Sequence, residues 1–344
     1  DQVKRRTYNA MPVPSALTHD EYRDGSNDQV VIMNPENWKY FIENNVKGGT
    51  PESLFEPYKK YMVQDSMNIK EAVNFLKKKS PEKDEILKLL FGEEKYQRYN
   101  FLPVSKFVLP VNKANAVKSG IITAKAAAKA VDYITINYKR GNMFKADYML
   151  MDILANFDWN RPINFSTGGI YEDQNIFYLN DYLQFDGFSY RLVPIKTKET
   201  EDGEMGRVDA DDLYKVVKNY RWGNFKDLKV HFDETCTSNI IGYRSSASRA
   251  AEALILEGKK SKAIEILDLA SKEIPSSKYN DPRSLSSMVY GYIVAGQEQK
   301  GLQLAEQLKK DIFQEYDYYL SLSHYEQQFV KKQMGSQPIL YSIV

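Results

Sequence analysis

The segment EGKKSKAIEILDLASKEIP, residues 257–275, has the spacing that decides the fold class of the C-terminal part of the chain. Gly258, Ala263, Ala270 and Pro275 follow one another at steps of 5, 7 and 5 residues. These steps are typical of a tetratricopeptide hairpin, in which small side chains let two helices approach closely. The segment therefore predicts a pair of closely packed helices.

A second, degenerate unit follows in AGQEQKGLQLAEQLKK, residues 295–310, where Gly296 and Gly301 repeat the first step of 5. Gly258 and Gly296 are 38 residues apart, whereas a tetratricopeptide repeat spans about 34. We assign the extra residues to the loop SSKYNDP, residues 276–282. Residues 239–334 show only helical patterns, so they predict an all-α tetratricopeptide-like domain, or alternatively two generic helical hairpins. Such stacks usually dock onto a neighbouring domain or a peptide.

Helical and strand patterns are mixed over residues 1–230, which predicts an α+β domain ahead of the helical tail. The clearest strand is VDYITINYK, residues 131–139, whose alternation predicts an antiparallel, half-exposed strand. Four further segments read as short strands: residues 29–35, 106–111, 161–166 and 190–196. Three segments predict helices: residues 68–80, 80–92 and 147–157. In the first two, Asn68 and Ser80 are the expected N-caps.

Composition excludes several classes of protein. The 344 residues suffice for two domains, and 47 basic against 46 acidic residues give a net charge of +1, which argues against nucleic acid as a partner. Cys236 is the single cysteine, and the three histidines match no zinc signature, so we predict no disulfide framework, no metal and no cofactor. The chain has no apolar run of 18 residues and opens on Asp1, so we expect a soluble piece of a longer protein.

Known reaction motifs are missing from the sequence. It contains no P-loop, no dinucleotide-binding glycine motif after a strand, no G-x-S-x-G and no H-E-x-x-H. Acid pairs such as Asp147 with Asp152 could be assigned to a glycosidase, but 46 acidic residues produce such pairs by chance. We therefore predict no catalytic residue in this chain.

The segment DWNRPINFSTGG, residues 158–169, has two interpretations. In the structural one, which we favour, Trp159 seals a corner between a helix and a strand, Arg161 reaches the last carbonyls of the helix, and both are largely buried. In the functional one, Trp159 offers a stacking face to a sugar and Arg161 binds an anion. The candidate binding residues are Trp159 and Arg161, together with Tyr171 and Phe177 from the aromatic-rich loops that follow.

Long stretches of the chain resemble a bacterial family. They are the opening DQVKRRTYNAMPVPSALTHDEYRDG, then ADYMLMDILANFDWNRPINFSTGG from residue 146, and YLNDYLQFDGFSYRLVPIK from residue 178. These segments are similar to the family named domain of unknown function 2723, although Asn164 stands where the family pattern has tyrosine. Its full-length members resemble protein O-mannosyltransferases, which are multi-pass membrane glycosyltransferases with a soluble C-terminal region carrying tetratricopeptide-like helices.

The resemblance implies that this chain is the soluble C-terminal part of such a protein, facing the periplasm and tethered by membrane spans outside it. The catalytic residues would then lie in the membrane-embedded half, which would be the partner of this chain together with an acceptor protein or a glycan. Hence the expected function is acceptor or glycan recognition by an accessory domain. The alternative is a free-standing glycan-binding protein of the outer cell surface, and the reading frame upstream of Asp1 discriminates between them.

Overall fold

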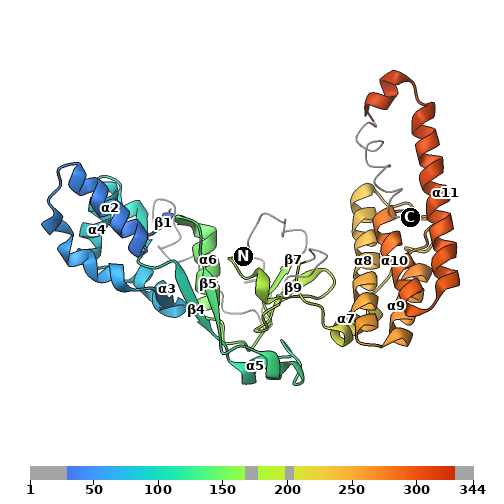
Figure 1. Ribbon diagram of the computed structural model, residues 1–344, viewed down its shortest axis with the longest axis horizontal. Coiled ribbons are helices and arrows are strands. Elements are labelled where there is room, and N and C mark those ends of the chain that lie inside the picture. The colour runs from blue at the N-terminus through green and yellow to red at the C-terminus, as the bar shows by residue number, and fades with distance from the viewer. Residues whose placement is uncertain (1–28, 167–176, 198–204, 330–344) are drawn as a thin grey trace. The chain divides into compact units, whose positions relative to one another are not determined.

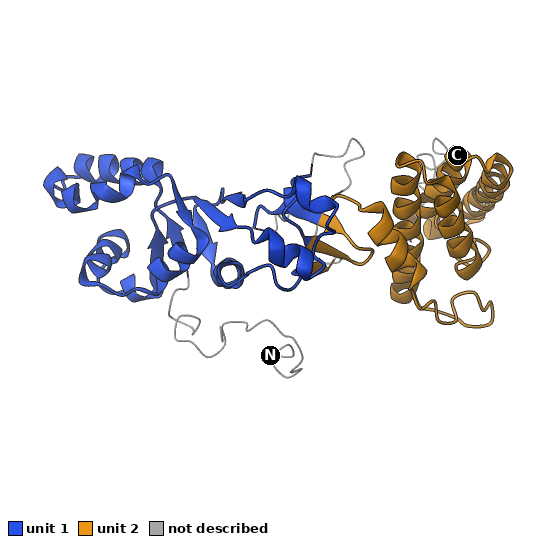
Figure 2. Cartoon of the chain, turned by 90° about the horizontal axis from the view of Figure 1, so that it is seen from below, with its two compact units in different colours: residues 1–163, 170–183, 192–204 blue, residues 164–169, 184–191, 205–344 orange. Residues whose placement is uncertain are grey.

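The computed structural model describes residues 29–166, 177–197 and 205–329, whose helices and strands are shown in Figure 1. The chain divides into two compact units, which Figure 2 colours separately. Unit 1 comprises residues 1–163, 170–183 and 192–204, and unit 2 comprises residues 164–169, 184–191 and 205–344.

Unit 1 contains two mixed three-stranded sheets. The first has the order β3-β1-β6, with β1 parallel to β3 and antiparallel to β6. Its strands are β1 (Gln29–Ile32), β3 (Tyr99–Leu102) and β6 (Asn142–Phe144). The second has the order β2-β4-β5, with β4 parallel to β2 and antiparallel to β5. Its strands are β2 (Ser66–Asn68), β4 (Lys106–Pro110) and β5 (Tyr133–Asn137).

The antiparallel strand expected over residues 131–139 is confirmed as β5. Ile134 and Ile136 are fully buried, whereas Tyr133 is exposed, as alternation along a pleated strand requires.

Unit 1 also contains helices, and two of them begin at the N-cap residues that the sequence predicted. Asn68 accepts a hydrogen bond from the backbone of Lys70, and Ser80 accepts one from Lys83, so both expected N-caps are confirmed. The helices are α2 (Pro35–Lys47), α3 (Ile69–Lys77), α4 (Pro81–Phe91), α5 (Lys113–Lys118) and α6 (Lys145–Ala155), with 3₁₀ turns η2 (Glu52–Val63), η3 (Tyr96–Arg98), η4 (Ala126–Lys129) and η6 (Asn180–Tyr182).

One lysine lies in the core of unit 1, where its side chain caps the C-terminus of helix α3. Lys83 is 6% exposed, and its Nζ donates to the carbonyl oxygens of Phe75 at 2.8 Å, Leu76 at 3.0 Å and Lys78 at 3.3 Å. These carbonyls have no partner within the helix, so the amine completes the C-terminus of α3. Burial lowers the pKa of Lys83 from 10.5 to about 8.

This shift predicts a pH dependence of stability. In the unfolded chain the amine keeps its usual pKa, so between about pH 8 and pH 10.5 the unfolded state holds a proton that the folded state has released. The free energy of unfolding should therefore rise with pH across this window, by up to about 3 kcal/mol from this group. Urea denaturation of the wild type and of Lys83→Met checks this, since the variant should lack the rise. Equal slopes for both proteins would contradict it.

Unit 2 is mainly helical, and this confirms the predicted fold class, an α+β part followed by a helical tail. A small sheet with the order β7-β9-β8 and helix α7 precede four long helices. These elements are β7 (Asn164–Ser166), β8 (Leu183–Phe185), β9 (Ser189–Leu192), α7 (Ala210–Lys218), α8 (Glu234–Leu256), α9 (Lys260–Glu273), α10 (Pro282–Ala295) and α11 (Glu298–Ser321). The sequence patterns did not indicate α7.

The four long helices pack as two hairpins, α8 with α9 and α10 with α11, visible side by side in Figure 1. Ala263 and Ala270 are fully buried, as their spacing predicted. Gly258 and Gly296 lie in the two connections with φ of +75° and +92°, a backbone conformation that favours glycine.

The longer connection between α9 and α10 holds an aromatic segment in place. Lys278 Nζ donates to the carbonyl oxygens of Phe225 at 3.2 Å and Asp227 at 2.7 Å, and the Tyr279 hydroxyl donates to Phe225 O at 3.1 Å. Arg244 donates in turn to the carbonyl oxygens of Ile274 and Tyr279. The additional residues of this connection therefore bind residues 220–232 against the start of the helical stack.

Candidate functional site

A polar groove lies in unit 1 where the strands of the second sheet end. Because β2 and β4 are parallel, their carboxyl ends meet at one edge, and each strand leads directly into a helix, α3 or α5. Strand β5 is antiparallel to β4, so its first residues lie at the same edge. The carboxyl ends of parallel strands are the usual place for ligands in open α/β sheets.

The groove has a volume of about 770 Å³ and collects residues from four separate segments of the chain. The C-terminal end of α6 and the residues that follow it supply one of these segments. Its lining consists of Asn68, Ile69, Lys70, Leu109, Pro110, Val111, Asn112, Lys113, Asp132, Leu154, Ala155, Asn156, Phe157 and Asp158.

Hydrogen bonds fix the polar rim. Lys113 Nζ lies 2.7 Å from Asp132 Oδ1, an ion pair that joins the start of α5 to the start of β5. Asn112 Nδ2 donates to Asp158 Oδ1 at 3.2 Å, and Asn115 Nδ2 donates to Asp158 Oδ2 at 2.8 Å. The Asp158 carboxylate is thus positioned by two amides that lie more than 40 residues away in the sequence, so the rim is preorganised.

Buried apolar side chains lie beneath the groove. Ile69, Leu109, Leu154 and Phe157 are buried, with exposed fractions of at most 6%. Below them, Asp152 of α6 is buried and pairs with Lys77 of α3 at 3.2 Å, which connects the two helices that border the groove.

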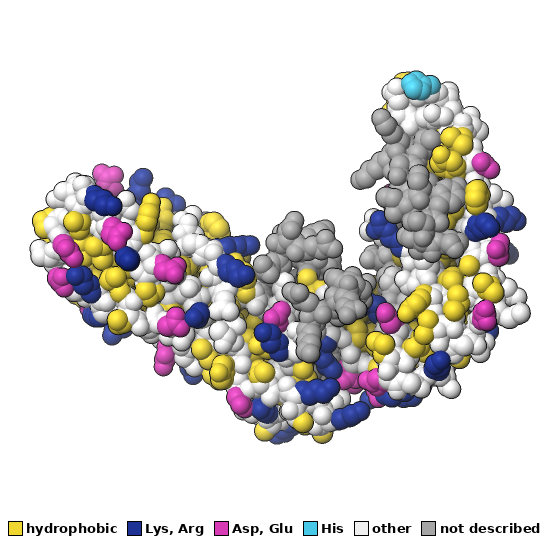
Figure 3. All heavy atoms as spheres, in the orientation of Figure 1, with side chains coloured by type: hydrophobic (Ala, Val, Ile, Leu, Met, Phe, Trp, Pro, Cys, Tyr) yellow, Lys and Arg dark blue, Asp and Glu magenta, His cyan; other side chains and the backbone are white. Residues whose placement is uncertain are grey.

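Charge on the lining is balanced. Lys70 and Lys113 contribute two positive charges, and Asp132 and Asp158 contribute two negative charges. Figure 3 shows the same mixing of both signs over the visible face of the molecule. The groove therefore has no net field that would select a strongly charged ligand.

Trp159 lies directly behind the groove. It is fully buried, its Nε1 donates to Pro110 O at 2.8 Å, and its ring centroid lies 4.6 Å from that of Phe157. Ser119 Oγ donates to the Trp159 carbonyl at 2.9 Å. The backbone of Trp159 has a φ of +57°, which is a strained conformation for a bulky residue. Such strain is often found at functional sites.

The predicted burial of Trp159 is confirmed, whereas Arg161 is only partly buried. Because the indole is enclosed by protein, a ligand would reach its face only after a change in packing. Phe177 is buried elsewhere in unit 1, with its ring centroid 5.6 Å from that of Tyr138, and Tyr171 lies outside the described residues. A binding role for these four residues stays a prediction, and the structure does not bring Trp159 and Phe177 into one site.

The groove residues themselves were missed by the sequence patterns. Asn112, Lys113, Asp132 and Asp158 belong to none of the motifs found in the sequence. The available signal was the position of these polar residues directly beside predicted strands, since Asn112 follows residues 106–111 and Asp132 begins residues 131–139.

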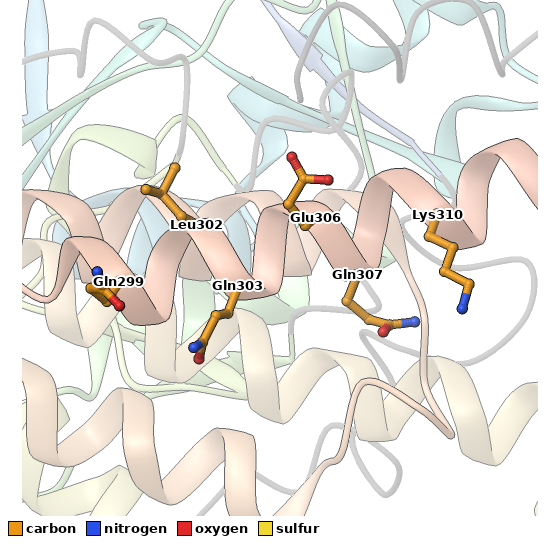
Figure 4. Close-up of a pocket in the computed structure, with 6 residues that line it drawn as sticks. All are labelled: Gln299, Leu302, Gln303, Glu306, Gln307 and Lys310. Carbon is orange, nitrogen blue, oxygen red and sulfur yellow. The ribbon is translucent and has the colours of Figure 1, made fainter.

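A second hollow lies in unit 2, along helix α11. It has a volume of about 600 Å³ and is lined by Gln299, Leu302, Gln303, Glu306, Gln307 and Lys310. Figure 4 shows that all six come from one helix, with Leu302 and Glu306 on one side of it and Gln303 and Gln307 on the other. Because a single element supplies its lining, we favour the groove of unit 1 as the functional site.

Two further findings concern the described part of the chain. Within residues 29–166, 177–197 and 205–329, no three His, Cys, Asp or Glu side chains are grouped so as to hold a metal ion. No helix in these ranges combines the length and the apolar character that a membrane span requires.

Comparison with known proteins identifies a family. Residues 1–212 match the family described as TMEM260-associated domain 2, and this match includes the whole groove. No curated protein and no solved structure matches the chain. The match covers more than half of the 344 residues, so the chain belongs to the TMEM260-associated domain 2 family.

Proposed function

We propose that this chain is an accessory domain of a TMEM260-like membrane protein and that the groove of unit 1 recognises the acceptor, a protein or its glycan. The observation that carries the proposal is the groove itself, a preorganised polar site at the carboxyl ends of β2 and β4 within the family-matched region. In this proposal the chain faces the periplasm, and a membrane-embedded half of the same polypeptide transfers a lipid-linked sugar.

Recognition at the groove is a binding role without chemistry of its own. A group that contacts the acceptor equally in the ground state and the transition state lowers KM and leaves kcat unchanged. The chain by itself should therefore transfer no sugar, and its loss should impair use of the acceptor by the membrane-embedded half.

The test is an assay of the full-length protein in membranes, with a lipid-linked sugar donor and an acceptor protein. Replacing both Lys113 and Asp132 by alanine should raise KM for the acceptor about tenfold and leave kcat unchanged, because about 1.4 kcal/mol of uniform binding is lost. The matched control replaces Lys106 and Asp65, an ion pair of 3.0 Å at the opposite end of the same strands. The control should behave as wild type.

Three outcomes would overturn the proposal. The first is an unchanged KM in the groove variant, and the second is sugar transfer by the isolated chain above a heat-denatured control. The third is an upstream reading frame with a lipoprotein signal and no membrane spans, which would favour a free-standing cell-surface glycan-binding protein.

A further inference from the structure

We infer that residues 338–344 pack on the C-terminal end of helix α11 and close that end of the helical stack. This inference concerns unit 2 and goes beyond the proposed function of the groove. It depends on three features of this part of the chain: a tyrosine of α11 that is buried past the start of α10, a turn that follows α11, and the composition of the residues after Phe329.

Helix α11 extends past its partner α10. The two helices form a hairpin around Gly296, and α11 has 24 residues whereas α10 has 14. Leu308 and Ile312 of α11 pack with Leu285 of α10 in one apolar cluster. Leu285 lies near the start of α10, which begins at Pro282. The residues of α11 that follow Ile312 therefore lie beyond the start of α10.

Tyr319 is buried in this extension. It follows Ile312 by about two helical turns, so its side chain points to the same face of α11, about 10 Å further along the axis. Only 9% of Tyr319 is exposed, although α10 does not reach this level. A further helical segment, residues 324–329, follows α11, but its two aromatic side chains, Tyr325 and Phe329, are each 70% exposed. Another segment is therefore needed to cover Tyr319.

The chain turns at the end of α11. Ser323 N donates to Glu326 Oε2 at 2.9 Å, and Gln327 Nε2 donates to Leu322 O at 3.0 Å, so hydrogen bonds fix the turn. Figure 1 shows that residues 322–329 leave the axis of α11. The two neighbours of Tyr319 in the sequence, Tyr318 and Leu320, are 59% and 52% exposed. An apolar segment that follows the turn would therefore find further apolar surface beside Tyr319.

The residues that follow supply an apolar segment of sufficient reach. Residues 330–344, which lie outside the described part of the chain, have the sequence VKKQMGSQPILYSIV, in which Pro338 separates a polar stretch from the apolar ILYSIV. The nine residues between Phe329 and Ile339 span up to roughly 30 Å when extended. The whole of α11 is about 36 Å long, so the apolar segment can reach any level of its C-terminal half. Its packing on Tyr319 and Leu320 would remove apolar surface of both partners from water.

Charge favours this segment over other partners. Residues 311–329 contain no lysine or arginine, and their acidic residues are Asp311, Glu315, Asp317 and Glu326. Residues 330–344 contain Lys331 and Lys332 and no aspartate or glutamate, so the two stretches attract each other. A second copy of the chain in a two-fold contact would instead bring two acidic ends together, and this repulsion would weaken the contact.

Hydrogen–deuterium exchange of the 344-residue chain tests the contact. In a variant with Ile339→Ser and Leu340→Ser, we expect the backbone amides of residues 313–321 to exchange about tenfold faster than in the wild type, because the end of α11 loses its cover. The amides of α8 and α9 should exchange at the wild-type rate. The matched control, Gln333→Ser with Gln337→Ser, changes polar positions of the same segment and should leave every rate unchanged.

Paramagnetic NMR locates the segment. A nitroxide is attached at Ser342→Cys in a Cys236→Ser background, because Cys236 is the single cysteine of the chain and is exposed. We expect the label to broaden the amide signals of residues 313–321 in the same molecule. A sample that mixes nitroxide-bearing molecules with isotope-labelled molecules should show no broadening.

The inference is overturned if exchange at residues 313–321 is unchanged in the apolar variant, if the control variant has the same effect, or if α8 and α9 also exchange faster. It is equally overturned if the label broadens signals elsewhere in the chain, or if broadening at residues 313–321 occurs only in the mixed sample, which would assign this surface to a second copy. Neither measurement involves the groove of unit 1, so the proposed function is tested separately.

Discussion

Trp159→Ala should lower the free energy of unfolding by about 3–5 kcal/mol, the cost of removing a large buried aromatic side chain. The indole is fully buried against Phe157, and its Nε1 bonds Pro110 O, the last residue of β4. The substitution would leave a cavity and an unpaired carbonyl directly behind the groove. Replacement by alanine would not relieve the backbone strain, because a φ of +57° is unfavourable for alanine as well as for tryptophan.

Urea denaturation followed by circular dichroism measures this change. Arg161→Ala is the matched control two residues away, and it should cost less because Arg161 is only partly buried. An unchanged midpoint for Trp159→Ala would contradict the structural role and would favour the earlier alternative, in which Trp159 contacts a ligand.

Arg244→Ala should destabilise the chain by on the order of 4 kcal/mol through a different mechanism. Arg244 is fully buried, and its guanidinium donates to Ser284 Oγ at 3.0 Å, Ile274 O at 3.1 Å and Tyr279 O at 2.7 Å. Without it, three buried acceptors lose their donor and a cavity forms between α8 and α10. Burial also lowers the pKa of Arg244 to about 10, which leaves the guanidinium charged at neutral pH.

Thermal and urea denaturation of Arg244→Ala and Arg244→Lys test this role. Lysine should restore only part of the stability, because a single ammonium group does not reproduce the planar fork of guanidinium donors. Arg283→Ala, an exposed arginine in the first turn of α10, should be nearly neutral. Equal effects of Arg244→Ala and Arg283→Ala would show that the buried network is unimportant.

Local structure was predictable because its causes are local. Asn68 and Ser80 cap helices through bonds that span two or three residues, so their sequence context suffices. The alternation in residues 131–139 reports burial on one face of a strand in the same way. The steps from Gly258 to Ala270 predicted a close helix pair, and both buried alanines confirm it.

The groove was not predictable, because its causes are long-range. The side-chain amides of Asn112 and Asn115 donate hydrogen bonds to Asp158, and Lys113 pairs with Asp132. The rim therefore exists only after the sheet has formed. No spacing rule connects these residues in the sequence. The aromatic segment at residues 220–232 was missed for the same reason, since Tyr279 and Lys278 bind it from more than 50 residues away.

Backbone amide NMR spectra of the chain, recorded while a glycosylated acceptor protein is added, test the central claim most directly. We expect the largest shifts at Asn68, Lys70, Lys113, Asp132 and Asp158, around the ends of β2 and β4, with little change elsewhere. Shifts concentrated on α11 around Gln303 and Glu306, or spectra unchanged at every concentration of the acceptor, would contradict recognition at the groove of unit 1.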